Sequence, residues 1–468
     1  MTTDVVFPQR ERYTDDLGGM LAALRKVHAS GRTRPLAWRL EQLAGIERLV
    51  KEREADFAEA LREDLGRSAV EAWLGDLAGS AGEATYARKN LKKWMKRKKQ
   101  RMPLSQLPGA GWVQCDPLGV VLVIGPWNYP VFLSLSPLVA AVAAGNCAVL
   151  KPSELAPATS ALLARLIPQY VDPDAVKVIE GDGATTQELL SLGFDHALFT
   201  GGIEIGKKIM AGAAETLTPV TLELGGKSPV IVSSDADIDV VARRIAWVKL
   251  MNSGQTCIAP DYVLAHNTIR DELVTKITAA LAQFQAGADP RGLRIVNERQ
   301  FDRLAGYLAA TKGTVVAGGG ADRGQLLIQA TVLVDPDPNE PAMTDEIFGP
   351  ILPVLSVDSD QVAIDFVNSR PKPLALYVFT KSKTTGERLI DAIPSGGAVL
   401  NHVAMHCLVP ALPFGGVGSS GMGAYHGRWG FEALSHRRAV LAKPSRPDPG
   451  FVYPPYTDRA IAIMRRLF

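Results

Sequence analysis

The chain has 468 residues, of which 47% are hydrophobic and 21% are charged, so it has enough apolar material for two or three globular domains. Lysine plus arginine (51) nearly balance aspartate plus glutamate (49), giving a formal net charge of +2. This balance argues against nucleic acid or a membrane surface as a partner, and favours small molecules or further copies of the chain.

The four cysteines, Cys115, Cys147, Cys257 and Cys407, form no CxxC pair and show no metal-ligand spacing. Neither a disulfide framework nor a zinc site is therefore expected, and a reducing cytoplasm fits best. The N-terminus has charges where a signal peptide would need an apolar core, and no apolar run approaches the length of a membrane span. We expect a cytoplasmic protein without a membrane span and without a bound metal.

The first hundred residues are expected to be helical, because apolar residues such as Leu36, Leu40 and Leu43 recur every three or four positions among charged ones. A basic run at 89–101 has apolar residues at helical spacing, so we interpret it as a solvated helix that ends in cations. After a break, residues 112–116 are expected to form a strand.

From residue 119 onward, short apolar runs alternate with helical patterns, which is typical of βαβ units around a parallel sheet, as in nucleotide-binding folds. A second alternating region follows residue 257, so two α/β domains are expected. The glycine-rich segment 412–427 has too little apolar periodicity for a regular element, and it is expected to be a long functional loop.

One cysteine lies in a run of small and polar residues, NSGQTCIAP at 252–260, between a helical pattern and an extended apolar run. Cys257 is therefore a candidate nucleophile on a loop, where backbone N–H groups lower the pKa of a thiol and can stabilise an oxyanion. A single cysteine is more often a small core residue, so this hypothesis depends on the other motifs.

Two further motifs are candidates for binding a dinucleotide. Gly201 and Gly206 follow an expected strand and open an expected helix, where glycines let backbone amides approach a pyrophosphate. The segment lacks both the G-x-G-x-x-G fingerprint and the Lys-Ser/Thr of a P-loop, so it is a weak signal alone. Lys151 and Glu154, in KPSE at another strand end, can both hydrogen-bond ribose hydroxyls.

Polar residues also follow two other expected strands. Asn128, in GPWNYP, is either a turn residue or a rigidly held amide. Glu223, in VTLELGG, is either a surface carboxylate or a buried one with a chemical task, because burying a carboxylate is costly. His402, His406 and His426 fit no common metal-ligand spacing, so loop or pocket-wall positions are expected.

The motifs GPWNYP, KPSE, FTG, LELGGKSP, NSGQTC, EIFGP and LPFGGVGSSGMG occur in this order along the chain. The sequence thereby resembles the aldehyde dehydrogenase superfamily, from the N-terminal helices to about Lys443. The short N-terminus, the CIAPDY context of Cys257 and the GAYHG run at 423–427 resemble its class 3 branch, which includes fatty-aldehyde and coniferyl-aldehyde enzymes.

The resemblance implies a role for each motif. Cys257 would be the nucleophile, Glu223 the general base, and Asn128 the donor to an oxyanion beside the backbone N–H of Cys257. A thiohemiacetal on Cys257 would pass hydride to NAD or NADP, and water would then hydrolyse the thioester. The implied cofactor contacts are Trp127, Lys151, Glu154, Gly201, Gly206, Leu224, Glu346 and Phe348, and the implied residues at the substrate mouth are Asn401 and Phe414.

The resemblance also implies an α/β aldehyde dehydrogenase fold and a homodimer. The expected parts are a Rossmann-like NAD(P)-binding domain at 1–100 and 119–223, a catalytic domain at 224–401, oligomerisation or bridging segments at 101–118 and 402–445, and a tail at 446–468. An aldehyde is the expected substrate. An acylating enzyme that transfers the thioester to coenzyme A is an alternative that Glu223 disfavours, and retention of Cys257 with Glu223 disfavours a non-catalytic protein on this scaffold.

Overall fold

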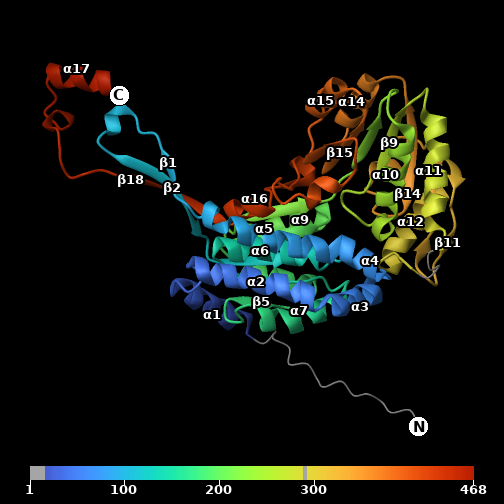
Figure 1. Ribbon diagram of the computed structural model, residues 1–468, viewed down its shortest axis with the longest axis horizontal. Coiled ribbons are helices and arrows are strands. Elements are labelled where there is room, and N and C mark those ends of the chain that lie inside the picture. The colour runs from blue at the N-terminus through green and yellow to red at the C-terminus, as the bar shows by residue number, and fades with distance from the viewer. Residues whose placement is uncertain (1–15, 288–291) are drawn as a thin grey trace, which may run out of the picture.

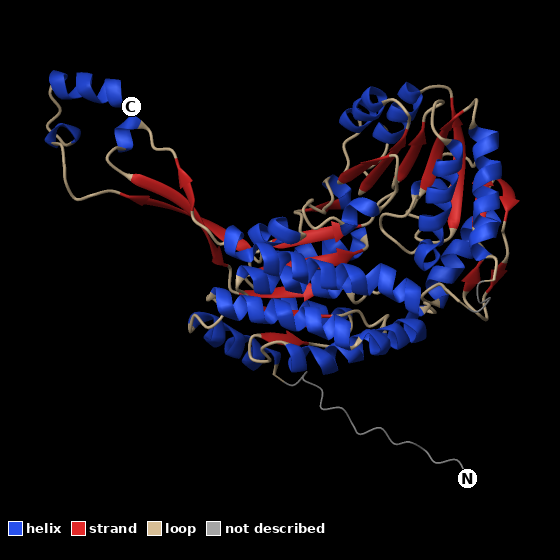
Figure 2. Cartoon of the chain, viewed as in Figure 1, coloured by secondary structure: helices blue, strands red, loops and turns tan. Residues whose placement is uncertain are grey.

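The computed structural model describes residues 16–287 and 292–468. These residues form two α/β lobes and an arm that projects away from them (Figure 1). A six-stranded sheet lies in one lobe and a seven-stranded sheet in the other, while the arm contains a three-stranded sheet. Helices flank both of the larger sheets (Figure 2).

The six-stranded sheet has the order β17-β7-β6-β3-β4-β5, and every neighbouring pair except β17 with β7 is parallel. β3 and β4 are buried at every residue, as expected for a parallel sheet that helices cover on both faces. The predicted βαβ sheet is thus confirmed. Its strands are β3 (Val120–Ile124), β4 (Cys147–Lys151), β5 (Val176–Val178), β6 (His196–Gly201), β7 (Val220–Leu224) and β17 (Gly421–Met422).

One helix of this lobe, α6 (Phe132–Ala144), is buried at every residue, because it is apolar on all sides and other helices pack over it. The other helices of the lobe are α1 (Leu17–Ala29), α2 (Leu36–Glu52), α3 (Glu54–Leu65), α4 (Ala69–Ala72), the π-helix η2 (Trp73–Leu77), α5 (Ala78–Trp94), α7 (Pro157–Tyr170), α8 (Gly183–Ser191), α9 (Ile203–Ala214) and α16 (Gly427–Ala433). The helical character predicted for the first hundred residues is found in five α-helices and one π-helix between residues 17 and 94.

The seven-stranded sheet has the order β10-β13-β14-β9-β8-β15-β16, with only β10 antiparallel to its neighbour. Its strands are β8 (Pro229–Val232), β9 (Tyr262–His266), β10 (Thr314–Ala317), β13 (Thr331–Val334), β14 (Ile351–Val357), β15 (Ala375–Phe379) and β16 (Gly397–Leu400). Its helices are α10 (Ile238–Leu250), η4 (Met251–Gly254), α11 (Arg270–Gln285), α12 (Glu298–Ala310), α13 (Pro341–Thr344), α14 (Asp360–Asn368), α15 (Lys383–Ala392) and η5 (Met405–Leu408), beside a small hairpin of β11 (Ala321–Asp322) and β12 (Leu327–Ile328).

The arm consists of β1 (Lys98–Gln100), β2 (Ala110–Pro117) and β18 (Ser435–Ala442), all antiparallel, with η3 (Leu104–Gln106) between the first two. The strand predicted at 112–116 is confirmed, but the helix predicted over 89–101 is wrong beyond Trp94, where α5 ends. β2 is the central strand, because β18 pairs with its whole length and β1 pairs with residues 111–113.

The segment 402–445 differs from the expected bridging element. Residues 421 and 422 pair with β7 as β17, and α16 packs against α5 and α6, so this segment also completes the first lobe. The rest of 412–427 is irregular apart from η6 (Gly418–Ser420). The tail contains η7 (Gly450–Val452) and α17 (Asp458–Leu467), which lies near the tip of the arm (Figure 1). In the described parts of the chain, no helix is both long and apolar enough to cross a bilayer.

Candidate active site

A cavity of about 1560 Å³ lies where the carboxyl ends of β3, β4, β6 and β7 meet the loop that follows α10. Parallel α/β sheets bind ligands at this edge. All of the predicted site residues except Gly206 and Asn401 line the cavity. The fold therefore brings together motifs that are widely separated in the sequence.

The loop that carries Cys257 begins with three residues in the left-handed region, and hydrogen bonds within the loop keep it in place. Asn252 has a φ of 51°, Ser253 a φ of 52° and Gly254 a φ of 70°. A Cβ at Gly254 would lie 2.2 Å from the carbonyl oxygen of Gly349, so only glycine fits there. The amide of Gln255 then donates to the Asn252 carbonyl at 3.0 Å. The position of the thiol is thereby set by the backbone of a tight turn.

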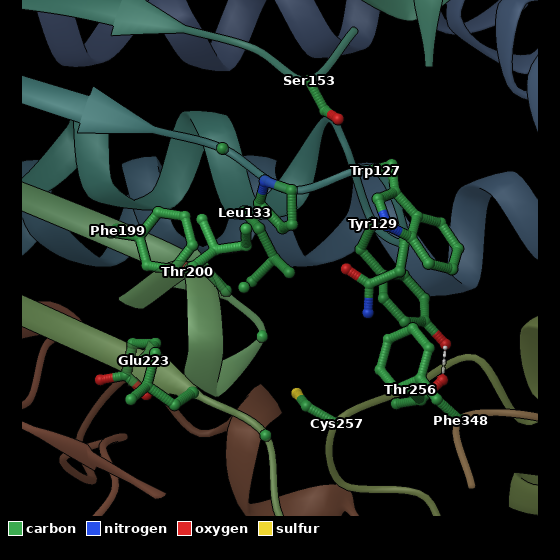
Figure 3. A pocket seen from close by; sticks show the side chains of 18 of the residues that line it. Trp127, Tyr129, Leu133, Ser153, Phe199, Thr200, Glu223, Thr256, Cys257 and Phe348 are labelled. Atoms are coloured by element: carbon green, nitrogen blue, oxygen red, sulfur yellow. Dashed lines mark hydrogen bonds between the residues drawn. The ribbon is translucent and has the colours of Figure 1, made fainter. Parts of the chain in front are cut away.

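The sulfur of Cys257 is directed into the cavity (Figure 3). Burial raises the pKa of this thiol, the charges of Glu346, Cys407 and Glu223 raise it further, and only its own backbone N–H lowers it. The prediction of a lowered pKa is therefore wrong, because desolvation outweighs the backbone N–H. Cys407 lines the same cavity. To attack a carbonyl, the Cys257 thiol needs a base or a nearby cation that favours the thiolate.

Glu223 is the penultimate residue of β7 and lies across the cavity from Cys257 (Figure 3). It is 2% exposed, and neither carboxyl oxygen has a hydrogen-bond partner among the residues that the structure describes. Burial without a partner raises the pKa of Glu223 well above its ordinary value. Of the two sequence interpretations, the buried carboxylate is correct, and a carboxyl group with a raised pKa is a strong proton acceptor once it is ionised.

Asn128 is 4% exposed and lies on the loop between β3 and α6. One N–H of its side-chain amide is held by the carbonyl of Gln255 at 3.1 Å, which leaves the second N–H for another acceptor. The neighbouring Tyr129 hydroxyl pairs with Thr256 Oγ1 at 2.7 Å (Figure 3). Two hydrogen bonds thus join the Asn128 loop to the two residues that precede Cys257.

The opposite end of the cavity has the groups that a dinucleotide requires. Gly201 and Gly202 lead into α9, whose first residues line the cavity, and a helix N-terminus favours a pyrophosphate. A Cβ on Gly202 would meet no described atom within 4 Å. Gly206 has a different role, since a Cβ there would lie 2.5 Å from the Leu224 side chain. Gly206 therefore permits close packing of α9 on β7, which corrects its predicted contact with the pyrophosphate.

Lys151 and Glu154 also line this end of the cavity, as expected for ribose-binding groups. Lys151 Nζ donates to Glu154 Oε2 at 2.8 Å. The lysine side chain is only 4% exposed, whereas the glutamate side chain is 45% exposed. The carboxylate is therefore the more accessible of the two groups to a ligand at the mouth of the cavity.

The EIFGP segment forms the wall between these two ends. Glu346 is half-buried, one of its carboxyl oxygens is buried without a partner among the described residues, and desolvation raises its pKa to about 8. Arg303 donates to the carbonyl of Glu346 at 3.0 Å and so holds the segment. The Phe348 ring meets the Trp127 ring edge-on, with centroids 5.3 Å apart. One carboxyl oxygen and two aromatic rings are thus available here to a bound cofactor.

The substrate side differs from the expectation at one residue. Phe414 lines the cavity, but the side chain of Asn401 bonds both backbone groups of Thr380 and lies outside the cavity lining. This position corrects the predicted substrate contact of Asn401. His426 lines the cavity, in agreement with the loop or pocket-wall position expected for it. Tyr425, which was not singled out from the sequence, also lines the cavity, and its buried hydroxyl has no partner among the described residues. The only sequence signal for Tyr425 was the GAYHG run.

The comparisons with known proteins agree with this geometry. Residues 5–440 match the aldehyde dehydrogenase family. Aldehyde dehydrogenase family 3 member A2 of Rattus norvegicus is 45% identical over 444 residues, which cover 94% of this chain and 91% of that protein. Aldehyde dehydrogenase family 3 member B1 of Homo sapiens is 43% identical over 460 residues, which cover 96% of this chain and 97% of that protein.

A solved structure gives the same result. The substrate-bound state of Staphylococcus aureus AldH superposes with a TM-score of 0.92 at 39% identity, covering 96% of this chain and 99% of that one. The predicted resemblance and fold are confirmed. The chain therefore belongs to the aldehyde dehydrogenase family, and it is an enzyme that oxidises aldehydes to carboxylic acids with NAD or NADP.

Proposed function

We propose that Cys257, Glu223 and Asn128 carry out the oxidation in two halves. In the first, the Cys257 thiol loses its proton to water, its sulfur bonds to the aldehyde carbon, and the carbonyl oxygen becomes an oxyanion beside the second N–H of the Asn128 side chain. The thiohemiacetal then loses hydride, which bound NAD or NADP accepts. The oxidised carbon remains on Cys257 as a thioester.

In the second half, Glu223 takes a proton from water while the water oxygen adds to the thioester carbon. The C–S bond then breaks, which releases the carboxylic acid and returns the thiolate of Cys257. Glu223 suits this step because its buried carboxyl has no competing hydrogen-bond partner among the described residues and its pKa is raised.

The observation that carries this proposal is that Cys257, Glu223 and Asn128 line one cavity with the dinucleotide end. The test is a panel of aliphatic, benzaldehyde-like and coniferyl-like aldehydes, assayed with each cofactor by following nicotinamide reduction and acid release. Acid should form with at least one class of aldehyde. Formation of product only when coenzyme A is added would identify the acylating alternative and contradict the proposal.

We propose that the enzyme accepts both cofactors and that Glu154 limits the use of NADP. An accessible carboxylate accepts hydrogen bonds from ribose hydroxyls but repels a 2′-phosphate. In Glu154→Gln, the ratio of kcat/KM for NADP to that for NAD should rise about tenfold, or ~1.4 kcal/mol.

The matched control is Glu188→Gln, which removes a carboxylate from the exposed face of α8 and should leave this ratio unchanged. An equal shift in both variants would show that net charge, rather than contact with the ribose, is responsible. An unchanged ratio in Glu154→Gln would mean that Glu154 does not face the ribose.

We also propose a homodimer that uses the arm, and a cytoplasmic location that suits four free thiols. The arm projects away from the two lobes (Figure 1), β1 covers only part of one edge of β2, and Leu441 on β18 is 51% exposed. Light scattering should give a mass twice that of one chain. Leu441→Asp should shift the equilibrium toward monomer.

The control for this prediction is Leu217→Asp, because Leu217 is 88% exposed in the loop after α9, away from the arm. This variant should remain dimeric. A stable wild-type monomer at micromolar concentration, or equal loss of the dimer in both variants, would contradict a dimer built on the arm.

A further inference from the structure

A buried ion pair lies beneath the active site, outside every motif that the sequence pointed to. Arg67 follows α3 and Asp76 lies in the π-helix η2, and their side chains are 1% and 0% exposed. Their guanidinium and carboxylate groups form an ion pair. Neither residue lines the cavity, so neither can touch the substrate or the cofactor.

The guanidinium of Arg67 contacts both loops that form the proposed oxyanion site. One terminal nitrogen donates to the backbone carbonyl of Asn128, and Nε donates to the side chain of Asn252 at 3.2 Å. The central carbon of the Arg67 guanidinium also lies 4.4 Å from the centre of the Tyr129 ring. One cation thus holds the residue that offers an amide to the oxyanion and the first residue of the nucleophile loop.

Asn252 completes the connection between these loops. Its side-chain N–H₂ donates to the carbonyl of Asn128 at 2.9 Å and to that of Gln255 at 3.1 Å, so it contacts both loops itself. The φ of 51° at Asn252 is a conformation that needs such support. Because Arg67 bonds the side-chain oxygen of Asn252, it also sets which way this amide faces.

Asp76 fixes the other end of the Asn128 loop. One of its carboxyl oxygens pairs with Arg67, and the other accepts from the backbone N–H groups of Val131 (2.9 Å) and Phe132 (2.7 Å) at the start of α6. Arg67 therefore holds the backbone carbonyl of Asn128 itself, and Asp76 holds the start of α6, a few residues later in the chain.

We propose that Arg67, oriented by Asp76, is a positioning residue that sets the Asn128 amide relative to the Cys257 thiol. This inference rests on the proposed role of Asn128 as the oxyanion donor. Lysine keeps the charge but lacks the planar fork that bonds Asp76, Asn128 and Asn252 at once. A misplacement of about 1 Å in a reacting group costs on the order of 100-fold in rate.

The test measures attack and hydride transfer in a Glu223→Gln background, where one turnover per site is expected. Arg67→Lys should lower the rate constant of the burst of reduced cofactor by about 10- to 100-fold, with burst amplitude per chain and aldehyde KM changed by less than about threefold. Asp76→Asn keeps the acceptor for α6 but weakens the grip on Arg67, so it should show the same pattern if Arg67→Lys does not fold.

The matched control is Arg39→Lys, another arginine of this lobe that is 3% exposed and donates to backbone carbonyls, those of Thr33 and Ala143. It should lower the melting temperature without changing the burst rate constant per site. A contrary result would be that Arg67→Lys leaves the burst rate constant unchanged and lowers only the burst amplitude or, like the Arg39→Lys control, only the melting temperature. In that case the role of Arg67 is structural and the proposal is wrong.

A double-mutant cycle identifies Asn128 as the residue through which Arg67 acts. Asn128→Ala alone should slow the burst about 100-fold or more. Arg67→Lys should then cost less than about threefold further in that background. Full additivity of the two effects would overturn the proposal. If Asn128→Ala alone has no effect, the proposed oxyanion role of Asn128 fails, which is a separate result.

Discussion

Replacing Cys257 with alanine is expected to lower kcat by at least about 10,000-fold and to abolish the burst of reduced cofactor. Without the sulfur, no covalent intermediate can form, and a hydrated aldehyde would have to lose hydride unaided. Stopped-flow measurement of nicotinamide reduction with an excess of aldehyde gives both the burst and the steady rate in one experiment.

Two controls decide which thiol is responsible. Cys407→Ala removes the other thiol that lines the cavity in the described parts of the chain, and it should keep the burst. Cys115→Ala removes a thiol from β2 in the arm and should resemble wild type. Appreciable dehydrogenase activity in Cys257→Ala, or loss of the burst in Cys407→Ala instead, would contradict the assignment of the nucleophile.

The motifs at strand ends could be located from the sequence because parallel sheets bind ligands at one edge. Lys151, Gly201 and Glu223 each end an apolar run, and the sheet brings all three to the cavity. The buried state of Glu223 also follows from its place inside VTLELGG, since β7 lies within the sheet. For these residues, local pattern and the general rule for parallel sheets were sufficient.

Features that depend on packing between distant segments could not be predicted in this way. The sequence pattern around Gly206 resembles a phosphate-binding loop, but glycine is needed there because the Leu224 side chain on β7 packs closely against it. The pKa of Cys257 depends on how fully the assembled cavity excludes water, which a loop sequence does not reveal.

The Arg67 and Asp76 pair illustrates the same limit. A charged residue in a helical region reads as solvent-exposed, and only the packing of η2 under the loop between β3 and α6 buries this pair. The β17 strand is similar, because its two residues lack any periodic signal, yet residue 421 pairs with Glu223 in the sheet. Long-range contacts therefore account for the positioning of the site, whereas sequence motifs account for its chemical groups.

Replacing Glu223 with glutamine is expected to separate the two halves of the reaction. Attack and hydride transfer remain possible, so the burst should reach about one reduced cofactor per site, while the following steady rate should fall by about 100- to 10,000-fold because water lacks its base. Glu346→Gln is the matched control. It changes a second cavity carboxyl whose pKa is raised, and it should weaken cofactor use without accumulating a thioester.

The stability of this variant distinguishes a chemical loss from a folding defect. Burial raises the pKa of Glu223, so the unfolded chain releases this proton at a lower pH than the folded enzyme does. Ionisation of Glu223 therefore destabilises the fold as pH rises above the ordinary pKa of glutamate. Glutamine keeps the shape without the charge, so at about pH 8 the variant should melt at or above the wild-type temperature.

The pH dependence of the steady rate and of the burst then distinguishes the ionisation of Glu223 from that of Cys257. Wild-type turnover should rise with pH as Glu223 ionises, because only the carboxylate can accept a proton from water. In Glu223→Gln, the steady rate loses this dependence on pH. If the burst rate constant still rises with pH in this variant, the rise is due to ionisation of the Cys257 thiol, because burial raises the pKa of that thiol too. A steady rate in Glu223→Gln that equals the wild-type rate at every pH would contradict the role of Glu223 as the base.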